Sequence, residues 1–175
     1  MDNSALFGKV ADQQAITDKI YRYARSVDRI DEKLGYTVWH EDGTADYGAD
    51  IYQGSGRGFI DWCCESHRHA LSHSHQMTNV IIELDGDRAS SETYAIVTVR
   101  FKGDRDDATI VQYMAWSRYL DKWSRRNGEW AIDARLVVID FDETREIKSS
   151  VKKSRASRDR LDPSYAVLQS GSFPG

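Results

Sequence analysis

Three stretches of sequence decide the fold: ASSETYAIVTVRF at residues 89–101, TIVQYMAWSRYLDKW at 109–123 and EWAIDARLVVIDF at 129–141. They are rich in Thr, Val, Ile and aromatic residues, which favour β-strands. A shorter stretch of the same kind, VIIEL, occupies residues 80–84, and turn-forming residues separate all four, as in Arg126-Asn127-Gly128. Consecutive strands joined by tight turns pair antiparallel. We therefore expect a four-stranded antiparallel meander.

The segments before this meander have helical rather than strand periodicity. Residues 11–30 carry one apolar stripe, formed by Ile16, Ile20, Tyr23, Ala24 and Val27. The spacing of this stripe predicts an amphipathic helix. Shorter helices are expected at residues 32–39 and 59–71, with a short strand at 44–47. The sequence GSGRG, with Gly54, Gly56 and Gly58, is interpreted as a flexible loop.

Helices followed by a meander indicate an α+β fold. Long antiparallel strands twist, and a long twisted sheet curls. N-terminal helices packed on the concave side of such a strongly curved, mainly antiparallel sheet would form a cone-shaped α+β barrel that encloses a cavity. Five Trp and nine Tyr residues in 175 suggest that this cavity has aromatic walls.

The composition places the chain as one domain without a membrane span. A length of 175 residues fits a single domain, which we expect at residues 1–144. No apolar run approaches the length of a membrane-spanning helix, and the first residues lack the pattern of a secretion signal, so we expect a cytoplasmic protein without a membrane partner. The two cysteines, Cys63 and Cys64, are adjacent and are not expected to form a disulfide.

The charge is unevenly distributed along the chain. The net charge is −4, but residues 145–162 carry +4 and the remainder therefore −8. An acidic body argues against a nucleic-acid-binding core. We interpret residues 145–175, basic at first and then uncharged, as a C-terminal tail that packs on a neighbouring subunit. The alternative is a short nucleic-acid-binding arm.

Four of the five histidines cluster in HRHALSHSH, as His67, His69, His73 and His75. A metal site is one interpretation. It is disfavoured because residues two apart on a helix point in divergent directions, so His67 and His69 could not share an ion. We therefore expect no metal. The other interpretation pairs one histidine with a carboxylate, which would fix the imidazole tautomer for proton abstraction.

Asp28 is the candidate carboxylate, because it lies one turn beyond Ala24 at the margin of the apolar stripe. Periodicity alone fits a solvated Asp28 and a surface His75 equally well. The choice between these interpretations depends on a family resemblance.

Three longer runs carry this resemblance: AITDKIYRYARSVDRIDEKLGYTVWHEDGTADYG at residues 15–48, HSHQMTNVIIELDGDRASSETYAIV at 73–97 and WSRYLDKWSRRNGEWAIDARLVVIDF at 116–141. Together they resemble the SnoaL-like group of the nuclear transport factor 2-like (cystatin-like) superfamily, over about residues 10–142. Within that superfamily the pattern is similar to scytalone dehydratase, hexachlorocyclohexane dehydrochlorinase and bile acid 7α-dehydratase.

The resemblance implies an Asp-His catalytic dyad in a cone-shaped cavity. The Y-x-x-x-x-D pattern falls on Tyr23 and Asp28, and the H-x-x-T-N pattern on HQMTN, beginning at His75. Asp28 and His75 would then form the dyad, with Tyr23 assisting. Arg135 matches a cavity cation of some relatives. Further candidate substrate-binding residues are Asn79, Trp62, Met77, Tyr113, Met114 and Trp116.

The function implied is that of a cofactor-independent lyase, a dehydratase or dehydrohalogenase acting on a small hydrophobic cyclic molecule. A homo-oligomer is expected, a trimer in preference to a dimer. Members of the same superfamily also include isomerases, cyclases, non-catalytic ligand-binding proteins and small subunits of ring-hydroxylating dioxygenases, so fold alone does not decide among these functions.

Overall fold

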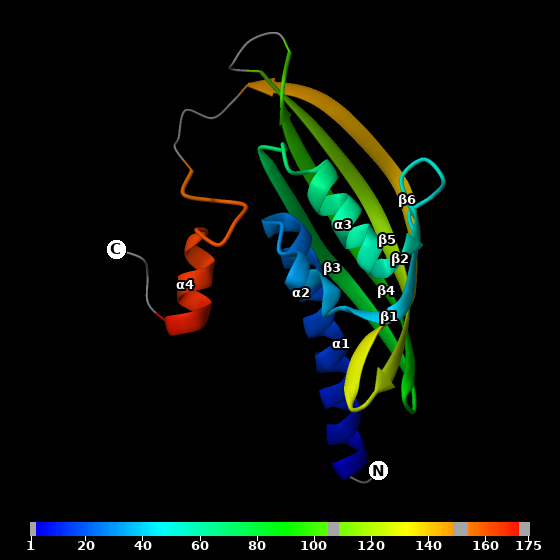
Figure 1. Ribbon diagram of the computed structural model, residues 1–175. Coiled ribbons are helices and arrows are strands. Elements are labelled where there is room, and N and C mark those ends of the chain that lie inside the picture. Colours follow the sequence, from blue (N-terminus) through cyan, green and yellow to red (C-terminus); the bar gives the residue numbers. More distant parts are fainter. Residues whose placement is uncertain (1–2, 105–108, 149–153, 172–175) are drawn as a thin grey trace.

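The computed structural model describes residues 3–104, 109–148 and 154–171. Its elements follow the predicted order of helices before the meander (Figure 1). They are α1 (Asn3–Arg29), α2 (Glu32–Tyr36), β1 (Trp39–Asp46), β2 (Gln53–Ser55), α3 (Gly56–Ser66), β3 (Ser72–Asp85), β4 (Arg88–Lys102), β5 (Thr109–Arg126), β6 (Glu129–Lys148) and α4 (Pro163–Ser170).

The strands form one mixed sheet in the order β2-β1-β6-β5-β4-β3. Strands β3 to β6 are the predicted antiparallel meander, with a turn at Asn127 and Gly128 that has positive φ at both residues. Strand β1 adds to its edge in parallel with β6. The sheet curves, and α1 and α3 lie across its concave side (Figure 1). The α+β class and the curved sheet under N-terminal helices are therefore confirmed.

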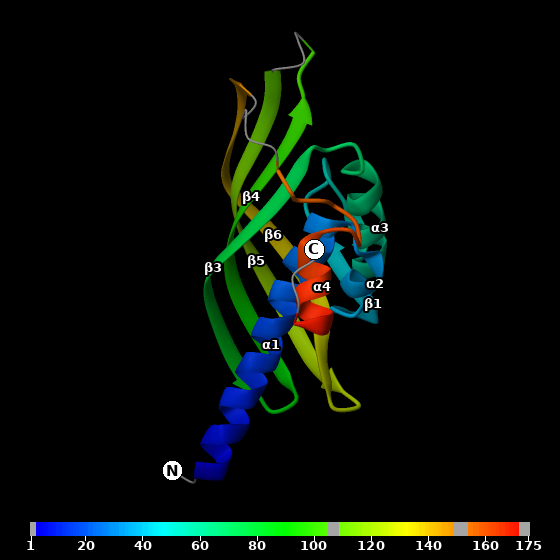
Figure 2. The same cartoon turned by 90° about the vertical axis from the view of Figure 1, so that its left-hand side faces the viewer.

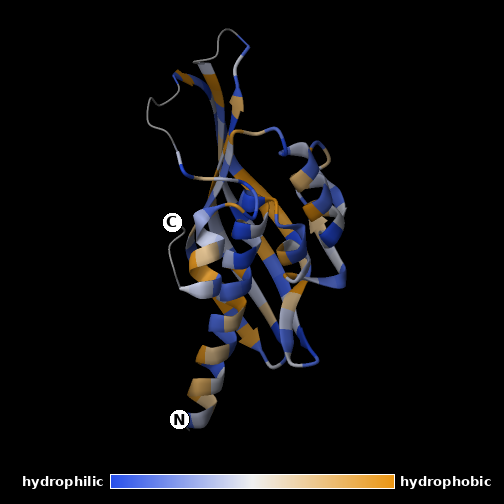
Figure 3. Cartoon of the chain, turned by 60° about the vertical axis from the view of Figure 1, so that its left-hand side comes forward, coloured by the Kyte–Doolittle hydropathy of each residue, from blue (hydrophilic) through white to orange (hydrophobic). Residues whose placement is uncertain are grey.

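The N-terminal half departs from the expected boundaries. Helix α1 begins at Asn3 and extends beyond the sheet (Figure 3), whereas we expected its start near residue 11. Strand β3 begins at Ser72, eight residues before the expected Val80. The GSGRG segment is also not a loop, because it ends β2 and starts α3. There Gly56 packs against Trp39, and a Cβ at Gly56 would lie 2.1 Å from the Trp39 ring. Glycine is needed for close packing rather than for flexibility.

The core lies between the helices and the concave face of the sheet. The predicted stripe of α1 is buried, with Ile16 and Ile20 fully inaccessible to solvent. Trp39, Trp123 and Ile132 bury against the same cluster from β1, β5 and β6. This packing fixes the position of α1, and with it the side chains at the C-terminal end of that helix. None of the described helices is both long and apolar enough to cross a membrane.

The C-terminal segment returns to the helical side of the molecule. Strand β6 continues to Lys148, so the expected domain boundary at residue 144 falls within a strand. Residues 154–171 then pack near the junction of α1 and α2 (Figure 2), where the Tyr165 hydroxyl donates to Asp31 Oδ2 at 2.9 Å. The segment thus contacts its own chain, and contact with a neighbouring subunit stays a prediction.

Candidate active site

A cavity of about 310 Å³ lies between the concave face of the sheet and the helices α1 and α3. Its walls are mostly apolar and aromatic. The strand residues that line it follow the alternation of a β-strand, because every second residue of a strand faces the same side. They are Val97, Val99 and Phe101 on β4, Tyr113, Ala115, Ser117 and Tyr119 on β5, and Val137 and Ile139 on β6.

Asp28 and His75 meet at the edge of this cavity. Asp28 Oδ1 lies 2.8 Å from His75 Nδ1, and Asp28 Oδ2 accepts the backbone N–H of His75 at 3.1 Å. The predicted contact is therefore confirmed. A carboxylate can only accept, so Nδ1 carries a proton, and in a neutral imidazole of this tautomer Nε2 has the free lone pair. His75 lines the cavity, and its side chain is 4% exposed.

A cluster of three tyrosines contacts His75 through Tyr23. The Tyr23 ring makes an edge contact with the His75 imidazole, and the Tyr23 hydroxyl lies 2.7 Å from that of Tyr47. Tyr119 packs edge-on against Tyr23. Burial raises the pKa of Tyr47 to about 12 and that of Tyr23 well above its usual value. All these phenols therefore stay protonated at neutral pH and can donate hydrogen bonds.

Arg135 lies behind these rings rather than on the cavity surface. Its guanidinium binds Asp121 through two hydrogen bonds, at 2.7 and 2.8 Å, and both side chains are fully buried. Burial alone would lower the pKa of Arg135, but Asp121 raises it above its usual value, so the guanidinium stays charged. Its Cζ lies 4.2 Å from the centre of the Tyr23 ring. The expectation that Arg135 lines the cavity is therefore wrong.

The remaining predicted substrate-binding residues divide by strand face. Trp62 and Tyr113 line the cavity as expected. Met114 and Trp116 do not, because they alternate with Tyr113 and Ala115 and so point to the opposite face, where Trp116 stacks on Phe141. A cavity position for these two residues is wrong.

Two candidates on β3 lie outside the cavity as well. Met77 packs against the edge of the core and lines a shallow surface pocket near Asp28. Asn79 is exposed, at the irregularity in the pairing of β3 with β4. That irregularity breaks the alternation that a regular strand would have.

Our sequence reasoning missed part of the cavity wall. Tyr47, Tyr119, His67, His73 and Cys63 all line it. The strict alternation from Tyr113 would have indicated Tyr119. No local pattern places Tyr47, because it reaches the cavity through the pairing of β1 with the distant strand β6.

The C-terminal segment supports the site through Arg158. Its guanidinium donates to the main-chain carbonyls of Val27 and Asp28, at the end of α1, and to those of His67 and Ala70, between α3 and β3. The carbonyls of Val27 and Asp28 are acceptors that a helix end leaves without an intrahelical partner. Arg158 thereby holds together the two segments that carry Asp28 and the histidines.

We expect Arg158→Ala to lower the free energy of unfolding by about 2–3 kcal/mol, because four main-chain acceptors lose a charged donor. Urea unfolding measures the loss. Arg155→Ala is the matched control, because Arg155 is exposed on the same segment, and it should leave the midpoint unchanged. Equal midpoints for the two variants would contradict the role given to Arg158.

Two further histidines of the cavity are held neutral, His73 beside His75 and His67 beside His73. Burial, together with the smaller effects of Arg158 and His75, lowers the pKa of His67 to about 4. Burial also lowers the pKa of His73 well below its usual value, with His75 and His67 as further causes. Their imidazole lone pairs are therefore available at neutral pH.

We expect the folded state to lose stability as the pH falls from about 6.5 towards 4. In that window an unfolded histidine binds a proton, whereas folded His67 and His73 do not, so protons favour the unfolded state. Urea midpoints measured across this pH range test the slope. His73→Asn should flatten it, and His69→Gln, a change at an exposed histidine, should not. A wild-type slope in His73→Asn would contradict the assignment.

Helices over the concave face of a curved, mainly antiparallel sheet form the cystatin-like, or nuclear transport factor 2-like, fold. Residues 8–136 match the SnoaL-like domain family, and the chain belongs to that family. No curated protein is similar enough in sequence to count as a match.

Solved structures with the same fold have low sequence identity to the chain. Kfla4162 from Kribbella flavida is 16% identical with a TM-score of 0.67, over 77% of this chain and 95% of the other. A protein from Novosphingobium aromaticivorans, provisionally named scytalone dehydratase, is 14% identical with a TM-score of 0.68, over 83% and 97%. The hexachlorocyclohexane dehydrochlorinase LinA-type3 from Novosphingobium barchaimii is 16% identical with a TM-score of 0.63, over 82% and 94%.

Proposed function

We propose that the protein is a lyase that eliminates water or a halide from a small hydrophobic, cyclic molecule, with His75 as the base. The observation that carries this proposal is the pair of hydrogen bonds from His75 to Asp28, which occupies Nδ1 and leaves Nε2 beside an apolar cavity. The family includes lyases of this kind. That likeness supports the proposal without identifying the substrate.

The reaction begins with a proton on the carbon adjacent to the one that bears the leaving group. His75 Nε2 takes this proton, and the electrons of the broken C–H bond form the new double bond. Asp28 stabilises the imidazolium through the Nδ1 proton, as a carboxylate does in hydrolase triads. The cavity is built for an apolar ligand, because its walls are aromatic and aliphatic apart from the histidines, Cys63, Ser117 and the tyrosine hydroxyls.

The leaving group departs with the electrons of its bond to carbon, and Tyr23 assists it. Arg135 donates to the Tyr47 hydroxyl at 3.4 Å, and Tyr47 can then donate to Tyr23. The Tyr23 hydroxyl then has its own proton free to donate, either to Tyr119 or to the leaving group. A departing halide accepts this hydrogen bond, whereas a departing hydroxide takes the proton and leaves as water, and the proton held by His75 restores the tyrosine. Arg135 acts through the two tyrosines, so it is a positioning residue rather than a catalytic one.

An isomerase is the second candidate, and it needs only the same base. If His75 returns its proton to another carbon, the double bond moves and no group leaves. The site geometry fits both reactions, because neither requires a group beyond the dyad and a hydrogen-bond donor. The products separate them, since elimination alone releases water or a halide ion.

The test is a panel of cyclic β-hydroxyketones and chlorinated cyclohexanes, incubated with the wild-type protein in deuterated water. Elimination predicts formation of an alkene together with the released group. Isomerisation predicts deuterium at a new carbon without release. Binding with neither reaction, measured by calorimetry across the panel, would show a ligand-binding protein and contradict both enzymatic candidates.

A further inference from the structure

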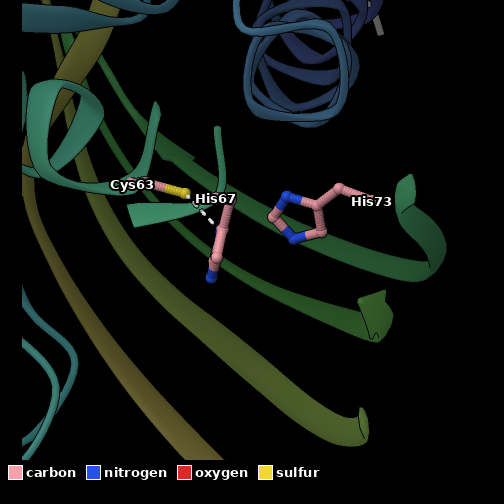
Figure 4. A group of neighbouring side chains, drawn as sticks. All are labelled: Cys63, His67 and His73. Carbon is pink, nitrogen blue, oxygen red and sulfur yellow. Dashed lines mark hydrogen bonds between the residues drawn. The ribbon is translucent and has the colours of Figure 1, made fainter. Parts of the chain in front are cut away.

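A thiol and two imidazoles converge where α3 gives way to β3. Cys63 comes from the last turns of α3, His67 from the residue that ends the helix, and His73 from the start of β3. Figure 4 shows the three side chains directed towards one another. One ligand atom from each lies within 4.8 Å of the others. All three residues line the cavity.

The spacing between Cys63 and His67 fits a tetrahedral zinc ion. Zinc lies about 2.3 Å from a thiolate and about 2.0–2.1 Å from an imidazole nitrogen, so two such ligands are about 3.5 Å apart. Cys63 Sγ and His67 Nδ1 are 3.4 Å apart. They are four positions apart in the sequence, and this spacing places side chains on one helical face, as in the paired histidines of zinc peptidases.

His73 completes a set of three. Its side chain is almost fully buried. A backbone contact with Val27 raises the pKa of the ring, but Nδ1 makes no hydrogen bond of ordinary geometry with the described residues. A buried polar atom that lacks a good hydrogen bond is unfavourable, and a bound ion would give the ring a partner. Both imidazoles are also neutral at pH 7, the form that binds metal.

We propose that Cys63, His67 and His73 bind a divalent cation of the zinc class, with its fourth coordination position open to the cavity. Three protein ligands and an open position are typical of catalytic rather than structural zinc sites. The open position would take an oxygen donor, such as a hydroxyl or carbonyl oxygen of a small hydrophobic molecule. This inference goes beyond the proposed function and does not depend on it.

Nearby charged residues affect both the ionisation of Cys63 and the affinity of this site for a cation. Arg158 lies near Cys63 and opposes a cation, but it also favours the thiolate, while Asp28 acts in the opposite sense on the thiol. Burial raises the pKa of Cys63, so this thiol must lose its proton when the ion binds. Apparent affinity should therefore rise about tenfold per pH unit between about pH 6 and 8.

A second set of ligand atoms competes for His73. Asp28, His73 and His75 also lie within 4.8 Å of one another. Asp28 and His75 are already bonded to each other, and an ion there would have to break that contact. Cys63 and His67 share only a weak thiol–imidazole contact, which an ion can replace with two stronger bonds. The first set is therefore favoured.

The experiment titrates metal-free protein with Zn²⁺ and Co²⁺ and follows Co²⁺ by its thiolate charge-transfer and visible absorption bands. We expect one ion per chain, a thiolate band, and release of about one proton in calorimetry. Cys63→Ser should abolish the thiolate band and weaken binding at least about 100-fold, since even outer-shell changes weaken metal binding 10–100-fold. His67→Gln and His73→Asn should weaken it similarly.

His69→Gln is the matched control, because His69 is exposed two residues from His67, and it should bind as the wild type does. Circular dichroism confirms that each variant is folded. Three results would overturn the proposal: no stoichiometric binding, full binding by folded Cys63→Ser, or loss of binding in Asp28→Asn with retention in His67→Gln. The last result would place the ion at the dyad.

Discussion

Replacing His75 with Gln is expected to lower kcat/KM for elimination by about 10²–10⁴-fold, the usual contribution of a positioned general base. Glutamine is similar in size and its amide N–H can still donate a hydrogen bond to Asp28, but it cannot take a proton from carbon. The His75 side chain is almost buried, so the substitution removes the base without opening the cavity. Steady-state kinetics on a substrate found with the wild-type protein measures the effect.

Two companion variants separate chemistry from binding. Asp28→Asn keeps the shape but removes the negative charge opposite His75 Nδ1, so its activity should fall towards that of His75→Gln. His69→Gln makes the same chemical change at an exposed position and should be fully active. Ligand affinity should change little in all three. A folded His75→Gln variant with wild-type kcat/KM would refute the assigned role.

The sheet could be predicted from sequence because its signal is local. The residue pattern of each strand of the meander, and the turn residues that follow it, are enough to predict that it pairs with the next strand. The parallel pairing of β1 with β6 could not be predicted in this way, because Trp39 and Ile132 become neighbours through a contact between distant parts of the chain. That pairing also brings Tyr47 to the cavity.

The faces of β5 show a different reason for error. Tyr113, Met114 and Trp116 were all expected to line the cavity, yet adjacent residues of a strand point to opposite sides. These residues were predicted because they are apolar, and apolar residues occur on both faces of this sheet. Alternation from Tyr113 predicts Ala115, Ser117 and Tyr119, and this is the set observed.

The histidine cluster depended on where a helix ends. A helix continuing to residue 71 would direct His67 and His69 apart, which argued against a shared ion. Instead α3 ends at Ser66, and the chain turns back so that the imidazoles of His67 and His73 lie 4.6 Å apart. By contrast, the contact between Asp28 and His75 followed from the family motifs, because periodicity alone left both residues open to a surface position.

Asp121→Ala is expected to lower the free energy of unfolding by about 3–5 kcal/mol, because it leaves the buried guanidinium of Arg135 without its counterion. The two residues face each other directly across β5 and β6. Arg135 also lies over the Tyr119 ring, with Cζ 4.5 Å from the ring centre. That contact cannot replace a carboxylate with two hydrogen bonds. Urea unfolding at neutral pH measures the loss.

The double variant Asp121→Leu/Arg135→Met tests the cause. It removes both charges and fills the space with apolar atoms, so it should be more stable than Asp121→Ala alone. Asp140→Ala removes one of the two carboxylate partners of Arg118, at a partly exposed pair, and should have only a small effect. Asp121→Ala unfolding at the wild-type urea concentration would contradict the argument. Because Arg135 orients Tyr47 and Tyr23 in our proposal, the stable double variant should still lose elimination activity while keeping its fold.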